Sequence, residues 1–328
     1  MSDTPSSTEP ANPHALAGHR EGNFVTTGDR HRFAGIPTFL RAPLARDGDQ
    51  PTIGIFGVPY DGGIIRTPGT RFGPRGIRNC CWRVEPHDRE LGVNPFEVHD
   101  IVDFGDLILS PFSLDDAMTA IDRGATKLLD RDILPIAIGG DHFITHPLLR
   151  AIHRKHGKVA VIHFDAHTDT ATEAYGQKLN HGTMFRRAVE EEIVDPEKFI
   201  QVGIRKLFSD DELDFHEEHG IEVITAERLR DIGAAGLKKS FARFAGEKVY
   251  VTFDIDFVDA AHAPAVGSPE LGGPSSSETL AAVRVLQGLD IIGFDLVEVA
   301  PSYDVRDLTC YLANLVLMAF VSMAPQRS

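Results

Sequence analysis

The sequence predicts a parallel α/β fold, because short apolar runs rich in β-branched residues alternate along the chain with longer segments of helical periodicity. Several of these runs are apolar on both faces, which is typical of parallel strands covered by helices on either side. With 328 residues, 42% of them hydrophobic, the chain can bury a sizeable core. No internal repeat is visible and no linker follows residue 25, so we expect one domain over 26–328.

Eight apolar runs are expected to form the strands. In chain order they span 53–58, 100–104, 133–138, 159–164, 199–204, 221–224, 248–253 and 291–299. Six helices are expected, over 114–131, 145–156, 210–219, 235–245, 276–288 and 307–323. Ser275 and Glu278 form an S-x-x-E capping box directly after Pro274, which predicts the start of the helix at 276. The segment 311–323 is the most apolar but is too short to span a membrane, so we expect a buried C-terminal helix.

Residues 1–25 are expected to form a disordered tail, because they are rich in Ser, Thr and Pro and lack the apolar region of a signal peptide. The cysteines Cys80, Cys81 and Cys310 are odd in number and form no C-x-x-C pair. We therefore expect neither a disulfide framework nor a zinc site, and a cytoplasmic location fits. The net charge of −15 disfavours nucleic acid and anionic membrane as partners and suits a small cationic molecule.

The segment 57–78, GVPYDGGIIRTPGTRFGPRGIR, is dense in Gly and Pro and predicts a long structured loop after the first strand. It contains neither G-x-G-x-x-G nor G-K-[ST], so it gives no support for nucleotide binding. Two interpretations stay open at this point: a turn-rich connection, or a loop that lines a site.

Charged side chains alternate directly after the fourth expected strand, in the stretch HFDAHTDT. If the chain stays extended there, Asp165, His167 and Asp169 project to one side, at the carboxyl edge where α/β folds bind ligands. Two carboxylates buried together are costly unless a cation pairs with them. Histidine beside oxygen donors is a common set of transition-metal ligands. The stretch therefore predicts a metal site.

Two other strand ends carry the same residue types. TFDIDF supplies Asp254 and Asp256, and AIGGDHF supplies Asp141 and His142. Each alone is also compatible with a turn or a helix cap, but three such ends at one sheet edge favour metal binding. The predicted ligands are His142, Asp165, His167, Asp169, Asp254 and Asp256. Their four carboxylates balance two divalent cations, and oxygen-rich ligation with imidazole favours Mn²⁺, with Ni²⁺ or Co²⁺ as alternatives and zinc disfavoured.

The order of these motifs resembles the ureohydrolase family, which includes arginase and agmatinase. The resemblance covers roughly 35–325 and rests on GGDHFITHP, FDAHTDT, NHGTMF, TFDIDFVDAAHAPAVGSPELGG, RTPGTRFGPRGIR and DLVEVAP. NHGTMF and DLVEVAP are closer to the agmatinase branch. The resemblance implies a three-layer α/β/α sandwich with an eight-stranded parallel sheet, two metal ions on the six ligands, and hydrolysis of a guanidino group to urea and an amine.

Three site residues take roles from this resemblance, and a fourth, Asp169, takes its role from the hydrolytic mechanism that we expect. Asp169 would orient the attacking water, His181 would relay protons, and Glu298 would bind the substrate guanidinium. Ser268 stands where the family usually has a threonine beside the guanidinium. Other interpretations of the last three residues are a capped loop histidine, a surface charge and a loop-capping hydroxyl.

The substrate stays open, because AVGSPE departs from the usual agmatinase pattern G-T-G-T-P-E beside the substrate. Agmatine, guanidinobutyrate and guanidinopropionate are candidates, and a nickel-dependent hydrolase of guanidine or of a biguanide such as metformin is the alternative. A distal carboxylate would need a cation, which Arg83 or Lys178 could supply. A distal ammonium would prefer an acidic residue such as Glu173.

Two other classes of protein share part of this pattern. A non-catalytic subunit of a mixed oligomer usually loses ligands, whereas all six are present here together with His181 and Glu298. Metal-dependent deacetylases resemble this fold but use one zinc and a shorter ligand set. The family commonly forms trimers or hexamers, so a homo-oligomer is expected and a hetero-oligomer is the alternative. Cys80, Cys81 and Trp82 receive no role.

Overall fold

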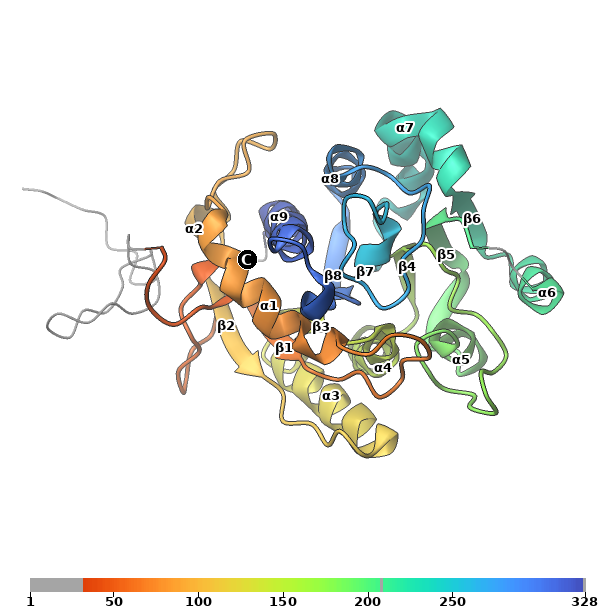
Figure 1. Cartoon of the computed structure of the whole chain (residues 1–328), viewed down its shortest axis with the longest axis horizontal. Helices are drawn as coiled ribbons and strands as arrows, with labels where there is room; N and C mark the ends of the chain where they lie inside the picture. The colour runs from red at the N-terminus through yellow and green to blue at the C-terminus, as the bar shows by residue number, and fades with distance from the viewer. Residues whose placement is uncertain (1–31, 207–208, 327–328) are drawn as a thin grey trace, which may run out of the picture.

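The computed structural model describes residues 32–206 and 209–326, so the expected tail over 1–25 lies outside the described residues (Figure 1). Within this part of the chain, one eight-stranded sheet runs in the order β2-β1-β3-β8-β7-β4-β5-β6. All of its pairings are parallel. The strands are β1 (Ile53–Val58), β2 (Ile101–Asp106), β3 (Leu134–Gly139), β4 (Val159–Phe164), β5 (Val194–Ile204), β6 (Glu222–Thr225), β7 (Lys248–Asp254) and β8 (Asp290–Val297). The predicted parallel α/β class is thereby confirmed.

Seven of the eight predicted strands agree with the structure to within two residues at either end, and β5 is the exception. It begins at Val194, five residues before the predicted start at 199. Val194 pairs with Val159 and Phe199 with Val161, so the residues between them bulge out of register. Those residues are polar and include Pro196, which removes the apolar signal from the sequence.

The helices cover both faces of the sheet and make a three-layer sandwich (Figure 1). They are α1 (Gly73–Cys80), α2 (Pro95–Val98), α3 (Leu114–Leu129), α4 (Thr145–His156), α5 (Met184–Glu190), α6 (Asp210–His219), α7 (Ala226–Phe241), α8 (Ser276–Arg284) and α9 (Leu308–Met323). One apolar cluster joins the sheet to α1, α7, α8 and α9, and a second joins its other face to α3, α4 and α5. In β1 the side chains alternate accordingly, with Ile55 in the first cluster and Phe56 in the second.

Three of the helices in the described residues were not predicted, and one begins earlier than expected. The helices α1, α2 and α5 are short, and α1 begins inside the Gly- and Pro-rich segment 57–78 and ends two residues after it. The helix α7 begins at Ala226 rather than at 235, and the side chain of Thr225 caps it by accepting from the backbone N–H of Arg228. Gly233 has a left-handed φ of 58° in the middle of α7, so the two halves do not share one helical periodicity. The predicted capping box of Ser275 and Glu278 is confirmed at α8.

The C-terminal helix α9 is buried along most of its length, as its composition predicts. Among the described residues, the structure contains no helix that is both long and apolar enough to cross a membrane. The apolar character of α9 is explained by its packing against α1, α8 and the sheet.

The centre of the sheet places four strand ends beside one another, because β3, β8, β7 and β4 are consecutive neighbours. Their registers are aligned at the carboxyl edge: Ile138 pairs with Leu296, Asp254 with Val297, and Phe253 with Phe164. Side chains that follow these strands are therefore brought to one edge of the sheet.

Candidate active site at the carboxyl edge

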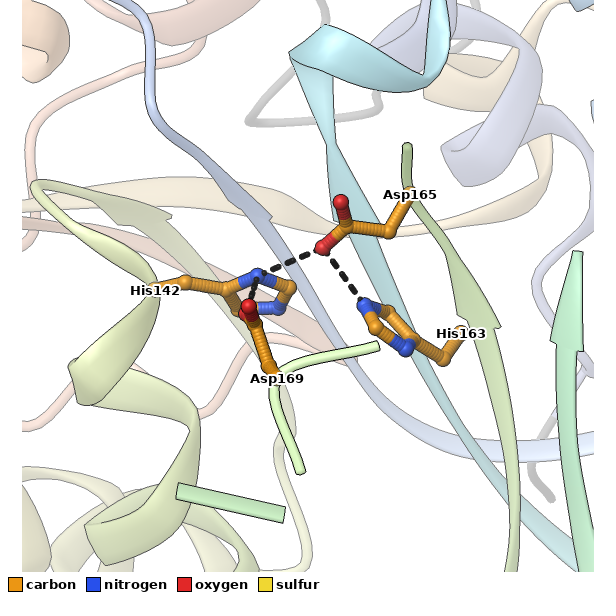
Figure 2. A group of neighbouring side chains, drawn as sticks. All are labelled: His142, His163, Asp165 and Asp169. Carbon is orange, nitrogen blue, oxygen red and sulfur yellow. Dashed lines mark hydrogen bonds and ion pairs between the residues drawn. The ribbon is translucent and has the colours of Figure 1, made fainter. Parts of the chain in front are cut away.

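The six predicted metal ligands converge at this edge, and we call them the His–Asp cluster. Nδ1 of His142 lies 3.0 Å from Oδ2 of Asp165, 3.0 Å from Oδ2 of Asp169 and 3.3 Å from Oδ2 of Asp254. Figure 2 shows His142, Asp165 and Asp169 pointing toward one another. Nδ1 of His167 lies 3.0 Å from Oδ2 of Asp256 and 3.4 Å from Oδ1 of Asp165. Asp165 therefore contacts both histidines.

The local backbone after β4 differs from the predicted extended chain. The strand ends at Phe164, and Asp169 adopts a left-handed φ of 53°. Backbone N–H groups hold the turn: His167 donates to Oδ1 of Asp165 at 2.6 Å, and Ala166 donates to Oδ1 of Asp256 at 3.0 Å. The three side chains thus converge through a turn held by the carboxylates themselves, and not through a continued strand.

A hydrogen-bonded chain behind His142 determines which ring nitrogen carries the proton. Thr252 donates its hydroxyl hydrogen to Oδ1 of Asp295 at 2.6 Å, and Asp295 also accepts from Thr145 and Tyr250. The Thr252 oxygen is then free only to accept, from Nε2–H of His142 at 2.9 Å. Nδ1 of His142 therefore presents its lone pair to the three carboxylates.

His163 is a member of the site that the sequence analysis missed. Its Nε2 lies 2.7 Å from Oδ2 of Asp165, and the two side chains point toward each other in Figure 2. The amide nitrogen of Gln201 contacts both Nδ1 of His163 at 3.0 Å and the carbonyl oxygen of Thr168 at 2.6 Å. A carbonyl can only accept, so this Gln201 atom is the donor and Nδ1 of His163 is the acceptor. Nε2–H of His163 then donates a hydrogen bond to Oδ2 of Asp165 and orients that carboxylate.

The electrostatics of the His–Asp cluster favour positive charge. Burial, together with Asp256 and Asp165, raises the pKa of Asp254 well above its usual value, and burial with Asp165 raises that of Asp256 to about 6. Burial lowers the pKa of His167, but Asp256 and Asp165 outweigh it and raise the pKa to about 12. The carboxylates thus lie so close together that their negative charges repel one another unless a cation lies between them.

The donor set of the cluster fits divalent cations. Nδ1 of His142 is buried and, although it lies close to three carboxylate oxygens, it makes no hydrogen bond within the described chain. An imidazole lone pair and several carboxylate oxygens that face one point are the usual surroundings of a transition-metal ion. Two groups of side chains are close enough to hold a metal ion: Asp165, His167 and Asp256, and His142, Asp165 and Asp169 with His163, whose two ring nitrogens are already hydrogen-bonded.

Glu298 and His181 lie together at the edge of the cluster. Oε1 of Glu298 accepts from the backbone N–H of His142 at 2.9 Å and contacts Nδ1 of His181 at 3.0 Å. Oε2 of Glu298 is buried and has no hydrogen-bond partner among the described residues. Glu298 has a left-handed φ of 66°, and such backbone strain in a buried acid is typical of functional sites.

The hydrogen bonds of His181 correspond to its neutral ring, with the proton on Nδ1. Nε2 accepts from the backbone N–H of Ile65 at 3.1 Å, so Nδ1–H is the donor to Glu298. Burial lowers the pKa of His181, but the hydrogen bond and charge of Glu298 outweigh it and raise the pKa to about 9. His181 can therefore take up a second proton at Nε2 once the contact with Ile65 opens.

A cavity of about 220 Å³ joins these groups. It is lined by Ile65, Arg66, His167, Asp169, His181, Gly182, Asp254, Asp256, Ser268 and Glu298. Ser268 and Glu298 thus line the same cavity. The loop 57–78 lines the cavity through Ile65 and Arg66, so it is more than a connection.

The charged residues proposed for the distal end of a substrate are not the ones that line the cavity. Arg83 donates to the carbonyl of Arg306 and pairs with Asp307 at 3.3 Å, beside the start of α9. Lys178 and Glu173 are likewise not among the lining residues. Arg66 lines the cavity instead; it is the first residue of the motif RTPGTRFGPRGIR, but the sequence assigned it no role of its own.

Comparison with known proteins agrees with this fold. The model of the arginase family matches residues 51–322. A guanidinobutyrase of Pseudomonas aeruginosa is 38% identical over 90% of this chain and 94% of its own length. An agmatinase of Edwardsiella ictaluri is 40% identical over 84% of this chain and 89% of its own length. The solved structure of proclavaminate amidinohydrolase from Streptomyces clavuligerus superposes with a TM-score of 0.85 at 37% identity, covering 89% of this chain and 98% of that one.

The family match and the amidinohydrolases among the relatives place this fold in the class of hydrolases that act on amidino carbon–nitrogen bonds. Within that class, the chain belongs to the arginase family. The predicted resemblance to the ureohydrolases is confirmed, as is the eight-stranded sandwich that it implied.

Proposed function

We propose that this chain hydrolyses a small guanidino compound to urea and an amine at the His–Asp cluster. The observation that carries the proposal is Oε2 of Glu298, a buried carboxylate oxygen with no hydrogen-bond partner in the described chain, in the same cavity as the cluster. Leaving such an oxygen without a partner is costly. A planar guanidinium donates N–H groups in the fork geometry that a carboxylate accepts. Glu298 is therefore suited to hold a guanidinium beside the cluster.

The cofactors of the proposed enzyme are two divalent cations. The inner position would use His142, Asp169 and Asp254, the outer position would use His167 and Asp256, and both would share Asp165. Bound there, the cations would make a water molecule acidic enough to react at neutral pH. Oxygen-rich ligation with some imidazole favours Mn²⁺, and Ni²⁺ is the alternative.

The chain's own side chains would perform the remaining steps. Glu298 would place the guanidinium carbon beside the cluster, and the Ser268 hydroxyl would accept a further N–H from it. Asp169, which lines the cavity, would accept a hydrogen bond from the attacking water and orient it. The departing amine needs a proton, and His181 would deliver it after protonation at Nε2.

The direct test combines metal analysis with an assay of urea release. The purified protein, expressed with Mn²⁺ or Ni²⁺, is expected to contain two metal ions per chain. Urea release is then measured on agmatine, guanidinobutyrate, guanidinopropionate, free guanidine and metformin with each metal. Turnover of guanidine or metformin with Ni²⁺ alone would select the nickel-dependent alternative. Absence of metal and of urea throughout would contradict the proposal and favour a non-catalytic subunit.

His181→Ala tests the proton relay separately from metal binding. The variant is expected to lose about 10²–10⁴-fold in kcat, the range of general acid catalysis, while its metal content stays at the wild-type value. His87→Ala, at an exposed histidine outside the cavity, is the matched control and is expected to change neither. Loss of metal together with activity would instead make His181 a structural residue.

A further inference from the structure

We propose that Arg66 makes this site selective for guanidino acids, that is, for substrates with a carboxylate at the end distal to the guanidino group. This inference rests on the proposed function and specifies its substrate class. Arg66 lines the cavity, and its side chain is 51% exposed, whereas Glu298 is 3% exposed. A substrate whose guanidinium is held by the buried Glu298 would therefore extend its other end toward the open side, where Arg66 lies.

Hydrogen bonds on both sides of Arg66 fix the loop that carries it. On one side, Ile65 donates to His181 at 3.1 Å, and Gly63 donates to Asp141 at 2.7 Å. On the other side, Gly69 donates to Asp61 at 2.9 Å. The position of Arg66 relative to the cavity is thus held by the fold rather than by its own side-chain contacts.

This loop also passes close to the unpartnered oxygen of Glu298. A Cβ atom at Gly267 would lie 3.1 Å from Oε2 of Glu298 and 3.2 Å from the carbonyl oxygen of Thr67. Thr67 is the residue after Arg66, so a glycine at 267 permits the Arg66 loop and Glu298 to approach each other across one small residue. Both groups can therefore act on the two ends of one small molecule.

The charges around Arg66 leave it able to bind an anion. Its contact with Glu270 is long, at 3.9 Å, while Lys206 pairs with the same carboxylate at 3.2 Å and Nε2 of His167 lies 3.4 Å from it. Arg66 and Lys206 thus share the carboxylate of Glu270, which leaves these three side chains with one net positive charge. A substrate carboxylate would balance that charge, and Arg66 could bind it through a bidentate pair.

A distal ammonium would meet the opposite situation. Every carboxylate that lines the cavity belongs either to the His–Asp cluster or to Glu298, so the lining offers no further acid to agmatine's second charge. Placing that ammonium beside Arg66 brings like charges together, which is an effective way to reject a substrate. Sequence similarity does not separate the two cases, because the relatives include a guanidinobutyrase, a guanidinopropionase and agmatinases at comparable identity.

The test compares kcat/KM on guanidinobutyrate, guanidinopropionate and agmatine for the metal-loaded full chain. The wild type is expected to prefer one of the guanidino acids over agmatine by at least about tenfold. Arg66→Gln should lower kcat/KM on the acids by about 10- to 100-fold, mainly through KM, because a charge-assisted bond is lost while the chemistry is unchanged. Arg66→Lys should restore part of the loss, and Arg66→Glu should move the preference toward agmatine.

Arg123→Gln, which removes an exposed arginine on α3 outside the cavity, is the matched control and should leave the acid-to-agmatine ratio unchanged. If the wild type prefers agmatine, or if Arg66→Gln and Arg66→Glu leave that ratio unchanged, the assignment of Arg66 is wrong although the proposed function stands. If the wild type releases urea from no guanidino compound with either Mn²⁺ or Ni²⁺, the proposed function itself fails.

Discussion

His142 and His167 occupy two ends of the His–Asp cluster, and the two ends differ in burial and in what lies behind each ring. The His142 side chain is 1% exposed and is backed by Thr252 and Asp295, both fully buried. The His167 side chain is 19% exposed and is backed by Glu270, a partly exposed carboxylate. The inner end is therefore built into the core, whereas the outer end is held by groups that solvent can reach.

This difference in burial suggests that the two ends of the His–Asp cluster have different roles. A buried hydrogen-bond chain fixes the tautomer of His142 and makes the inner end rigid. At the outer end, Glu270 also contacts Lys206 and Arg66, so the groups behind His167 are connected to those that face the substrate. We expect the inner end to govern how tightly the metal is retained and how stable the fold is. We expect the outer end to govern metal exchange and substrate specificity.

Asp165→Asn should have the largest effect, because Asp165 contacts both histidines and serves both ends. Asparagine keeps the volume but removes the charge that the two ends share. We expect kcat/KM to fall by at least about 10³-fold and metal content to fall below one ion per chain. Elemental analysis and urea release measure the two effects. A variant that retains both metals would show that Asp165 is not shared and that the ends are independent.

His142→Asn and His167→Asn compare the two ends directly. The inner variant leaves the buried Thr252 hydroxyl oxygen without the Nε2–H donor of His142 and should cost about 1–3 kcal/mol of unfolding free energy. The outer variant lies at a partly exposed position and should cost less than about 1 kcal/mol. Denaturant unfolding after treatment with a chelator isolates this effect from that of metal. Equal losses would contradict the distinction between a core-built end and a solvent-facing end.

Thr252→Val tests the group behind the inner histidine. Valine has nearly the same shape but cannot accept from Nε2–H of His142, so the ring loses the bond that fixes its tautomer. Loss of such an orienting partner typically weakens metal affinity by about 10- to 100-fold. Competition with a chelator of known affinity gives the change for the more tightly bound ion. Unchanged affinity would mean that the carboxylates alone orient His142.

The strands of the sheet and the residues of the His–Asp cluster could be predicted from the sequence, because both leave a signal within short segments. The strands are buried on both faces, so they appear as continuous apolar runs, and the charged residues that follow β4 and β7 interrupt those runs abruptly. The short helix α1 and the first half of α7 were missed because Gly and Pro in α1, and Gly233 in α7, weaken the helical signal.

The missed site residues depend on contacts between distant parts of the chain. His163 lies inside a strand and acquires its role only through Gln201, 38 residues later. Thr252 is one β-branched strand residue among several until the fold places it beside His142. The direction of Arg66 depends on the bond from Ile65 to His181, 116 residues apart. No pattern of spacing within a single segment contains that information.

Glu270→Gln is the smallest change that distinguishes the outer end from the inner one. An amide oxygen can still accept from Nε2–H of His167, and a pair that is partly exposed contributes little because solvent screens it. We therefore expect less than about a fivefold change in the affinity for the weaker-bound ion, and this change should shrink as salt is added. Chelator competition at low and high ionic strength measures it. A loss as large as that of Thr252→Val, independent of salt, would show that Glu270 orients His167 as tightly as the buried chain orients His142, and the contrast between the two ends would then reduce to solvent exposure alone.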